Sequence, residues 1–331
     1  MNKFISKKDL LSWLGKLRET RRLIAPTRVE DLTLFKEVSR VEDIVFDYQN
    51  TDLPPKQFLF PATETIFSIE KKDGRVELVP AKVEKETVIF GVRPCDAKGI
   101  LTLGMPFLEE PGDPLFREHR EKTILVGISC LTACPECFCA SMGSAPDDPS
   151  GMDIMLTGVK DGYLIQVLTD KGKALMPDSL LSSVDTPKPP APQVSTVPSK
   201  GITEKMRQAF DDPYWGRVAD RCLHCNVCSY VCPTCYCFDV RDYGGKNKTE
   251  RVRSWESCQS PGFSKIAGGY DPRANKGTRM RQRFAHKLLY FPEHFGTMHC
   301  IGCGRCVRAC PVNIDIREII QDVQKLGVKE K

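Results

Sequence analysis

The first twenty residues show hydrophobic positions with the spacing of a helix. Ser6 precedes the segment as a candidate N-cap, and Asp9 lies three residues further along. Four leucines share one face of such a helix: Leu10, Leu11, Leu14 and Leu17. We therefore expect a helix that docks on a protein core through this leucine face.

Three later segments show the pattern of β-strands. Residues 86–92, 123–129 and 162–169 are short, rich in β-branched side chains and bounded by turn or charged residues. A helix followed by such strands indicates an α+β or α/β N-terminal domain, which we assign to residues 1–183.

This pattern stops between residues 184 and 200, a stretch with five prolines and no aromatic residue. It offers little to bury and is typical of an extended, semi-rigid connector. We place a domain boundary here and assign residues 201–331 to a second, mainly α-helical domain with a basic insertion at 233–299. The alternative is a proline-rich loop that crosses the surface of one domain.

Cysteine is the informative part of the composition. The chain has 331 residues, 41% of them hydrophobic, and a formal net charge of +5, which is too weak to argue for nucleic acid or a membrane. Its 16 cysteines do not suit a disulfide framework, which is typical of short secreted chains. The charged N-terminus lacks a secretory signal, and no stretch approaches the roughly 20 apolar residues of a membrane span. We therefore expect metal-binding cysteines in a reducing cytoplasm.

Eight of the cysteines form two runs with identical spacing. Both runs read C-x-x-C-x-x-C-x-x-x-C-P, the arrangement of bacterial ferredoxins, and the prolines are Pro233 and Pro311. In two-cluster ferredoxins the first three cysteines of a run bind one [4Fe–4S] cluster and the fourth binds the other cluster. We therefore expect a first cluster on Cys222, Cys225, Cys228 and Cys310, and a second cluster on Cys300, Cys303, Cys306 and Cys232.

Zinc is the main alternative, because C-x-x-C pairs are also common in zinc sites. A tetrahedral zinc site has no use for a third cysteine and a C-x-x-x-C-P step that occur twice, so the spacing favours iron–sulfur clusters. Fully thiolate-ligated clusters leave no open iron for a substrate. The runs thus indicate one-electron transfer rather than catalysis.

Five further cysteines lie in the N-terminal domain. Cys95 follows one expected strand, and the others follow the next: Cys130, Cys134, Cys137 and Cys139. If the two strand ends lie side by side, these cysteines meet, so we expect four of the five to bind a third [4Fe–4S] cluster. A zinc site and buried free thiols are the alternatives.

Three cysteines remain after these assignments, namely Cys235, Cys237 and Cys258. CPTCYC at 232–237 repeats the pattern of CPECFC at 134–139. We interpret the three as packing thiols near the clusters, with a role in a further site as the alternative. His224 and His299 lie beside cluster cysteines, and we expect neither to be a ligand.

Residues 241–287 hold twelve Lys and Arg against four Asp and Glu. This excess either compensates negative cluster charge, forms a docking face for an acidic partner, or is a solvated basic face. No G-x-G-x-x-G motif follows a strand, and no G-x-x-x-x-G-K-[ST] motif occurs, so no motif supports nucleotide binding.

The motifs together resemble a known family, which comprises the beta subunit of cytoplasmic sulfhydrogenases and the dicluster electron-transfer subunit of anaerobic sulfite reductase. The resemblance covers most of the chain from about residue 90 onward and rests on GVRPCDAK, DPLFREHR, GISCLTACPECFCASMG, RCLHCNVCSYVCPTCYCFDV, RVRSWESCQSPGF, RQRFAHKLLYFPEHFG and CIGCGRCVRACPVNIDIREII. It implies an electron-transfer subunit between a flavin-containing NAD(P)H oxidoreductase subunit and a catalytic partner. That partner is a nickel–iron hydrogenase, a sirohaem sulfite reductase or a heterodisulfide-reductase-like assembly among the relatives. The low potential typical of ferredoxin-type clusters makes ferredoxin a further exchange partner.

Three hypotheses follow. The first is a non-catalytic relay subunit of a soluble, oxygen-sensitive complex, which we favour because no acid, base and nucleophile stand together in the sequence. The second is an oxidoreductase subunit with its own catalytic site and a flavin in the N-terminal domain. The third is a nucleic-acid-binding protein that uses the basic segment 241–287.

Overall fold

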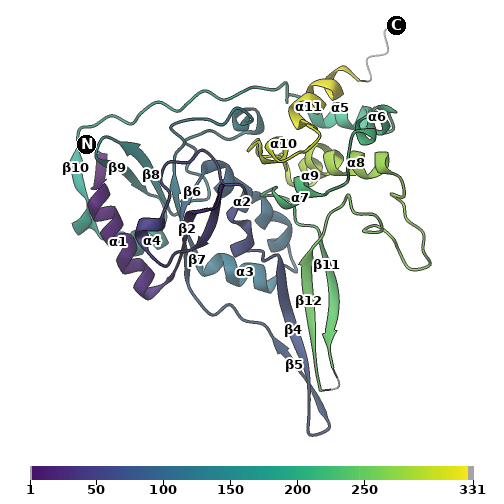
Figure 1. Ribbon diagram of the computed structural model, residues 1–331, viewed down its shortest axis with the longest axis horizontal. Coiled ribbons are helices and arrows are strands. Elements are labelled where there is room, and N and C mark those ends of the chain that lie inside the picture. The colour runs from purple at the N-terminus through teal and green to yellow at the C-terminus, as the bar shows by residue number, and fades with distance from the viewer. Residues whose placement is uncertain (1, 246, 327–331) are drawn as a thin grey trace.

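An eight-stranded mixed sheet forms the N-terminal part of the computed structural model, which describes residues 2–245 and 247–326 (Figure 1). Its strand order is β10-β1-β9-β8-β7-β6-β2-β3, with parallel pairing among β2, β6, β7 and β8 and antiparallel pairing toward both edges. The strands are β1 (Asn2–Ser6), β2 (Arg22–Val29), β3 (Leu32–Glu37), β6 (Thr87–Val92), β7 (Thr123–Ile128), β8 (Ile154–Val159), β9 (Gly162–Val167) and β10 (Ser182–Val184).

Helices cover both faces of this sheet. Val88 and Phe90 of β6 face a core shared with α1 (Lys7–Thr20) and α4 (Asp170–Leu175). Ile89, between them, faces the opposite core, shared with α2 (Pro94–Leu108) and α3 (Pro114–Glu121). A strand with helices on both sides is buried on both faces, and all six residues of the largely apolar β6 are buried. The N-terminal part is thus a mixed α/β structure, and β6, β7 and β9 confirm the three expected strands.

Helix α1 also confirms the sequence pattern. The hydroxyl of Ser6 caps it by accepting a hydrogen bond from the backbone N–H of Asp9 at 3.1 Å. The buried face differs in one detail, since Leu11 is only half-buried and Trp13 is buried instead. The indole N–H of Trp13 donates to the carbonyl of Leu175, which ties α1 to α4.

The C-terminal part contains a helical core. Its helices are α5 (Ile202–Gln208), α6 (Tyr214–Asp220), α7 (Val227–Tyr230), α8 (Lys276–Ala285), α9 (Phe291–Phe295), α10 (Arg305–Arg308) and α11 (Ile316–Lys325). Shorter turns are η1 (Val41–Asp43), η2 (Pro55–Phe58), η3 (Cys139–Met142), η4 (Asp178–Leu180) and the π-turn η5 (His286–Tyr290). Trp215 and Phe284 stack between α6 and α8 in the centre of this core. Among the described residues, no helix is long and apolar enough to cross a membrane.

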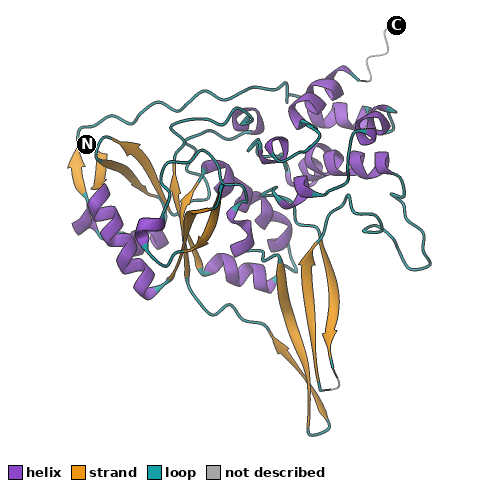
Figure 2. Ribbon diagram, in the orientation of Figure 1, coloured by secondary structure: helices purple, strands orange, loops and turns teal. Residues whose placement is uncertain are grey.

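A four-stranded sheet projects from the body as an arm built from both halves of the chain (Figure 2). The N-terminal half supplies β4 (Thr63–Lys72) and β5 (Arg75–Pro80), and the C-terminal half supplies β11 (Phe238–Gly244) and β12 (Lys248–Trp255). The order is β11-β12-β4-β5, so β12 pairs with β4 across the expected domain boundary. The expectation of a mainly α-helical C-terminal domain is therefore corrected, because this region combines helices with a long β-hairpin.

The connector expected at residues 184–200 is extended, and it contacts the cysteine-rich loop of the N-terminal part. The backbone N–H of Ser195 donates to the carbonyl of Cys137, and that of Val197 donates to the hydroxyl of Ser141. Val197 is buried in the C-terminal core. The segment thus contacts both halves of the chain.

A fully buried ion pair joins the two halves. Arg305 of α10 donates to both carboxylate oxygens of Asp96 on α2, at 2.5 and 2.9 Å, and also contacts the backbone carbonyl and hydroxyl of Thr51. Neither charged side chain exceeds 1% exposure. Burial lowers the pKa of Arg305, but the charge of Asp96 outweighs this effect, so the pKa is raised overall.

We predict that Asp96→Ala lowers the free energy of unfolding by about 3–5 kcal/mol, because it leaves a buried guanidinium without its counter-charge. Asp239→Ala, which removes the exposed Arg241–Asp239 pair, is the control and should have no measurable effect. Urea denaturation under anaerobic conditions measures both. Equal stabilities of the two variants would contradict the prediction.

Candidate metal centres

The thiols expected to bind the first cluster line one pocket. Cys222, Cys225, Cys228 and Cys310 contribute to its wall together with Arg283. Cys225 is exposed and the other three are partly buried, so this group lies near the surface. The guanidinium Nε of Arg283 and the amide oxygen of Gln259, which also lines the pocket, are buried and lack a hydrogen-bond partner among the described residues. Four thiols with the unpaired guanidinium donor of Arg283 beside them fit a bound anionic group such as a cluster.

The backbone explains how short C-x-x-C turns bring three sulfurs to one side. His224 and Asn226 have φ values of 54° and 63°, and the same positions in the second run, Gly302 and Gly304, have 66° and 74°. Asparagine tolerates this left-handed region better than most residues, and glycine adopts it freely. Equivalent short helices, α7 and α10, follow in both runs and pack on each other. The two runs therefore adopt the same local structure.

Hydrogen bonds reach three of the four sulfurs in the first group. The backbone N–H of His224 donates to Cys222 Sγ at 3.3 Å, and that of Ile314 donates to Cys310 Sγ at 3.2 Å. The side-chain amide of Gln259 donates to Cys228 Sγ at 3.2 Å. Donors to ligand sulfurs stabilise negative charge and thereby set the reduction potential of a cluster.

The second group lies deeper in the protein. Cys232 is close enough to raise the pKa of Cys300, Cys303 and Cys306 through its charge. Burial is the larger cause, and raises the pKa of Cys300 to about 12 and that of Cys303 to about 11. Lys287 and Arg305 lower the pKa of Cys300 and Cys303 in turn, but burial outweighs them. Coordination to a metal would remove the proton from each sulfur.

Two buried cations lie beside the ferredoxin-type cysteines. Lys287 Nζ is 3.2 Å from Cys232 Sγ of the second group, and Arg283 donates to the carbonyl of Cys228 of the first group at 3.0 Å. Burial opposes the charge of Lys287, yet the sulfurs of Cys232 and Cys235 outweigh it, so its pKa is raised. Both residues belong to the basic segment 241–287. Their position supports compensation of sulfur charge as one role of that segment.

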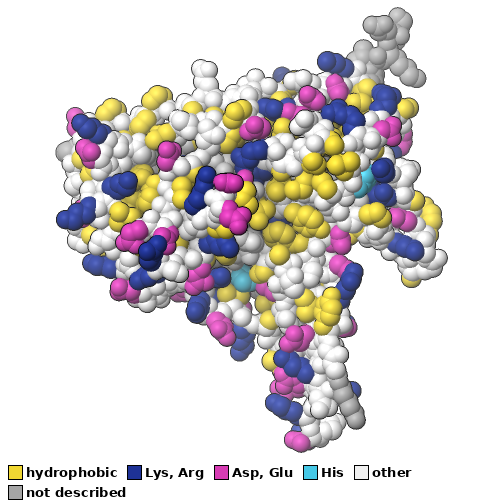
Figure 3. Space-filling view, viewed as in Figure 1, with side chains coloured by type: hydrophobic (Ala, Val, Ile, Leu, Met, Phe, Trp, Pro, Cys, Tyr) yellow, Lys and Arg dark blue, Asp and Glu magenta, His cyan; other side chains and the backbone are white. Residues whose placement is uncertain are grey.

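Other basic residues of the segment form ion pairs along the arm. Arg251 pairs with Asp242, and Arg253 is buried against Glu64 and Asp113. On the face shown in Figure 3, acidic and basic side chains are interspersed over the arm. The charge excess of the segment is therefore divided between buried and surface positions.

The five N-terminal cysteines also line a single pocket, which Cys95, Cys130, Cys134, Cys137 and Cys139 share with Cys303. The reason is the pairing of β6 with β7, because Cys95 follows β6 at the start of α2 and Cys130 follows β7. The amide oxygen of Asn50, which also lines this pocket, is buried without a hydrogen-bond partner among the described residues. The donor set fits a cluster, with one cysteine more than four ligands require.

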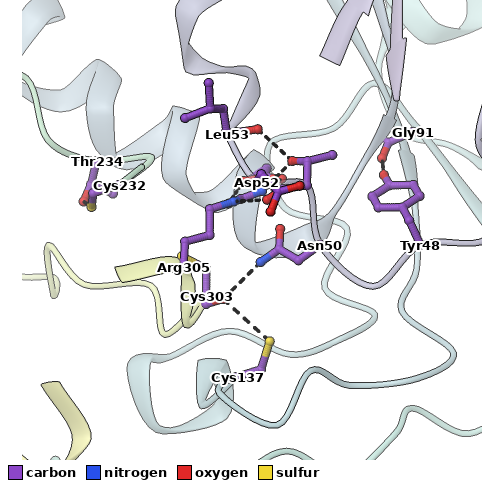
Figure 4. Close-up of polar contacts among 12 residues, drawn as sticks. Tyr48, Asn50, Asp52, Leu53, Gly91, Cys137, Cys232, Thr234, Cys303 and Arg305 are labelled. Carbon is purple, nitrogen blue, oxygen red and sulfur yellow. Dashed lines mark hydrogen bonds and ion pairs between the residues drawn. The ribbon is translucent and has the colours of Figure 1, made fainter. Parts of the chain in front are cut away.

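Cys303 connects this pocket to the second group (Figure 4). Its carbonyl accepts hydrogen bonds from the side-chain amide of Asn50 at 3.0 Å and from the thiol of Cys137 at 3.7 Å. The backbones approach so closely that a Cβ added at Gly302 would lie 2.6 Å from the carbonyl carbon of Phe138. The three groups of thiols are therefore contiguous.

The remaining cysteines and the histidines lie around the second group. Cys235 contacts Cys232, and Cys237 contacts Cys258. Within residues 2–245 and 247–326, no three His, Cys, Asp or Glu side chains converge as they would around a single metal ion. His299 is fully buried, stacks on Phe291 and makes a 2.7 Å hydrogen bond with the carbonyl of Thr234. Its ring therefore packs beside the second group.

Comparison with known proteins agrees with the cysteine spacing. Residues 221–314 match the family model of the 4Fe-4S dicluster domain. The chain is also 31% identical, over 330 residues, to Sulfhydrogenase 2 subunit beta of Pyrococcus furiosus, and the match covers 95% of each chain. It belongs to the sulfhydrogenase beta-subunit family.

This sulfhydrogenase beta-subunit homologue is thus an iron–sulfur, electron-transfer subunit of an oxidoreductase, with a dicluster domain that implies two [4Fe–4S] clusters. No solved structure matches the chain. The expected family resemblance is confirmed. Sequence reasoning missed Asp96 and Lys56, whose places beside the dicluster region depend on contacts more than 170 residues away in sequence.

We predict that Gly302→Ala lowers the iron content of this homologue, whereas Gly296→Ala does not. Both positions have a similar positive φ, so both substitutions share a backbone strain of roughly 1–2 kcal/mol. Only at Gly302 would the new Cβ meet the loop that carries Cys137 and Cys139, while nothing lies within 4 Å at Gly296. Iron analysis and melting temperature measure the difference, and identical results for both variants would argue against tight contact between the loops.

Proposed function

We propose that this chain relays electrons between a flavin-containing NAD(P)H oxidoreductase subunit and a catalytic redox subunit. The observation that supports the proposal is the contiguity of the three thiol groups. They extend from exposed Cys225, through the buried group around Cys303, to partly buried Cys130 and Cys137. An electron-transfer path between two partner subunits needs a succession of redox groups that leads from one protein surface to another.

The proposed ligands of the two ferredoxin-type clusters follow from the crossed pattern of the runs. The first cluster takes Cys222, Cys225, Cys228 and Cys310, and the second takes Cys300, Cys303, Cys306 and Cys232. Each [4Fe–4S] cluster supplies the capacity to take up and release one electron. Lys287, Arg283 and the donors to sulfur hold negative charge at these positions.

We propose a third [4Fe–4S] cluster on four of the five cysteines Cys95, Cys130, Cys134, Cys137 and Cys139. All five line the same pocket, and the carbonyl of Cys303 contacts the thiol of Cys137. A cluster there would extend the relay toward the N-terminal sheet.

The proposed partners come from the family. Pyrococcus furiosus Sulfhydrogenase 2 subunit beta is by its name part of a multi-subunit sulfhydrogenase. We propose that this chain likewise works in the reducing cytoplasm, between a flavin subunit and a hydrogenase, sulfite reductase or heterodisulfide-reductase-like subunit, with ferredoxin as a further exchange partner. The chain itself then carries electrons and performs no bond chemistry.

Anaerobically purified protein should contain about twelve irons and as many acid-labile sulfides in the three proposed clusters, and no stoichiometric flavin. About eight irons would leave the two ferredoxin-type clusters and overturn the third. Zinc with little iron would overturn the whole proposal, and one flavin per chain would favour a subunit with its own catalytic site.

A further inference from the structure

Cys235, Cys237 and Cys258 gather at the base of the β11–β12 hairpin. Cys237 directly precedes β11, and Cys258 lies three residues after β12. The register that pairs Phe238 with Trp255 continues beyond the strands, because the N–H of Glu256 donates to the carbonyl of Cys237 at 2.9 Å. The hairpin therefore brings the thiols of Cys237 and Cys258 into contact. These three cysteines lie outside the three groups of the proposed relay.

The hairpin base is packed directly against the first ferredoxin-type run. Cys235 contacts Cys232, and Gln259, the residue after Cys258, donates to Cys228 Sγ at 3.2 Å. The hydroxyls of Ser257 and Ser229 lie 2.9 Å apart, which fixes the same segment on α7. The three thiols thus adjoin the first run, including Cys232, which the crossed pattern assigns to the second cluster.

A buried lysine from the other half of the chain lies against this group. Lys56 is 2% exposed, and its Nζ donates to the carbonyl of Cys235 at 2.8 Å and lies 4.1 Å from the centroid of the Trp255 ring. No carboxylate pairs with Lys56 among the described residues. Burial lowers its pKa, and the sulfurs of Cys235, Cys232 and Cys237 oppose that shift.

The surroundings of Lys56 bear on the role of the thiols. Its Nζ donates to the carbonyl of Cys235 and lies over the Trp255 ring, and no carboxylate pairs with it among the described residues. Packing thiols and a Cys237–Cys258 disulfide are neutral, whereas coordination to a metal removes the proton from each sulfur and leaves negative charge beside the lysine. Cys232 of the proposed second cluster also lies beside Lys56, so the inference rests on the three further thiols gathered at the hairpin base.

We infer that Cys235, Cys237 and Cys258 hold an additional iron–sulfur cluster beside Cys232, with Lys56 as its buried counter-cation. Three thiolates suffice for a cuboidal three-iron cluster, or for a four-iron cluster whose fourth corner has no thiolate from this group. Such a cluster would form a branch of the relay at the base of the arm. This revises the interpretation of the three cysteines as packing thiols.

Cys237→Ser and Cys258→Ser in the full-length, anaerobically purified chain test the inference. Each should remove roughly three to four irons per chain and the matching sulfide, as read by iron analysis and native mass spectrometry. Tyr236→Phe, which removes only a hydroxyl that contacts His286, is the control and should keep the full iron content. If both proposals hold, the wild type contains about fifteen to sixteen irons and each serine variant keeps about twelve. The loss on substitution tests this site, whereas the iron that remains in the serine variants tests the proposed relay. Unchanged iron in both serine variants, or a Cys237–Cys258 disulfide found in the native protein, would overturn the inference.

Lys56→Met gives an independent readout that retains every thiol. Removing a buried positive charge disfavours the reduced, more negative state, so the spectroscopic signal that is absent from Cys237→Ser should shift to lower reduction potential in Lys56→Met. Because Lys56 also lies beside Cys232, a shift confined to signals that Cys237→Ser retains would place the lysine at the second cluster alone. That result, or unchanged potentials throughout, would also overturn the inference. Redox titration followed by electron paramagnetic resonance makes the measurement.

Discussion

The ion pair between Arg305 and Asp96 is the contact on which the arrangement of cysteines depends. Arg305 lies within the second cysteine run, between Cys303 and Cys306, and Asp96 is the neighbour of Cys95. A single bidentate contact therefore fixes the distance between a ferredoxin-type loop and the N-terminal cysteine pocket. Because both charges are fully buried, neither can move away without a large desolvation penalty.

Compensation of charge extends beyond that pair. Sulfur-rich groups in a buried environment accumulate negative charge, and the protein places Lys287, Arg283 and Lys56 next to them rather than next to carboxylates. Two of these cations come from the π-turn and the helix before it, and the third comes from the turn before β4. A π-turn is frequent at functional sites, and here it contains Lys287, which contacts Cys232.

Local patterns made much of this structure predictable. The N-cap at Ser6, the buried strands β6, β7 and β9, and the dicluster region were all readable from spacing and periodicity. The arm was not, because β4 and β12 are mostly half-buried strands that pair with each other although they lie far apart in the sequence. The burial of Lys56 was equally unpredictable, because nothing in its local sequence, two prolines before it and a glutamine after it, indicates a buried lysine. The ligand assignments of individual cysteines remain predictions, as does the division into domains.

The arm is built from segments that lie far apart in the sequence, and this constrains how the chain folds. The hydroxyl of Thr63 on β4 lies 3.3 Å from that of Ser254 on β12, although 191 positions separate the two residues. During synthesis β4 and β5 therefore leave the ribosome long before β12 exists, and the inner edge of β4 stays open in the meantime. An unpaired strand edge is a template for wrong pairing, and contacts of such long range form slowly. The nascent N-terminal half is thus prone to aggregation until the C-terminal hairpin has been synthesised and pairs with β4.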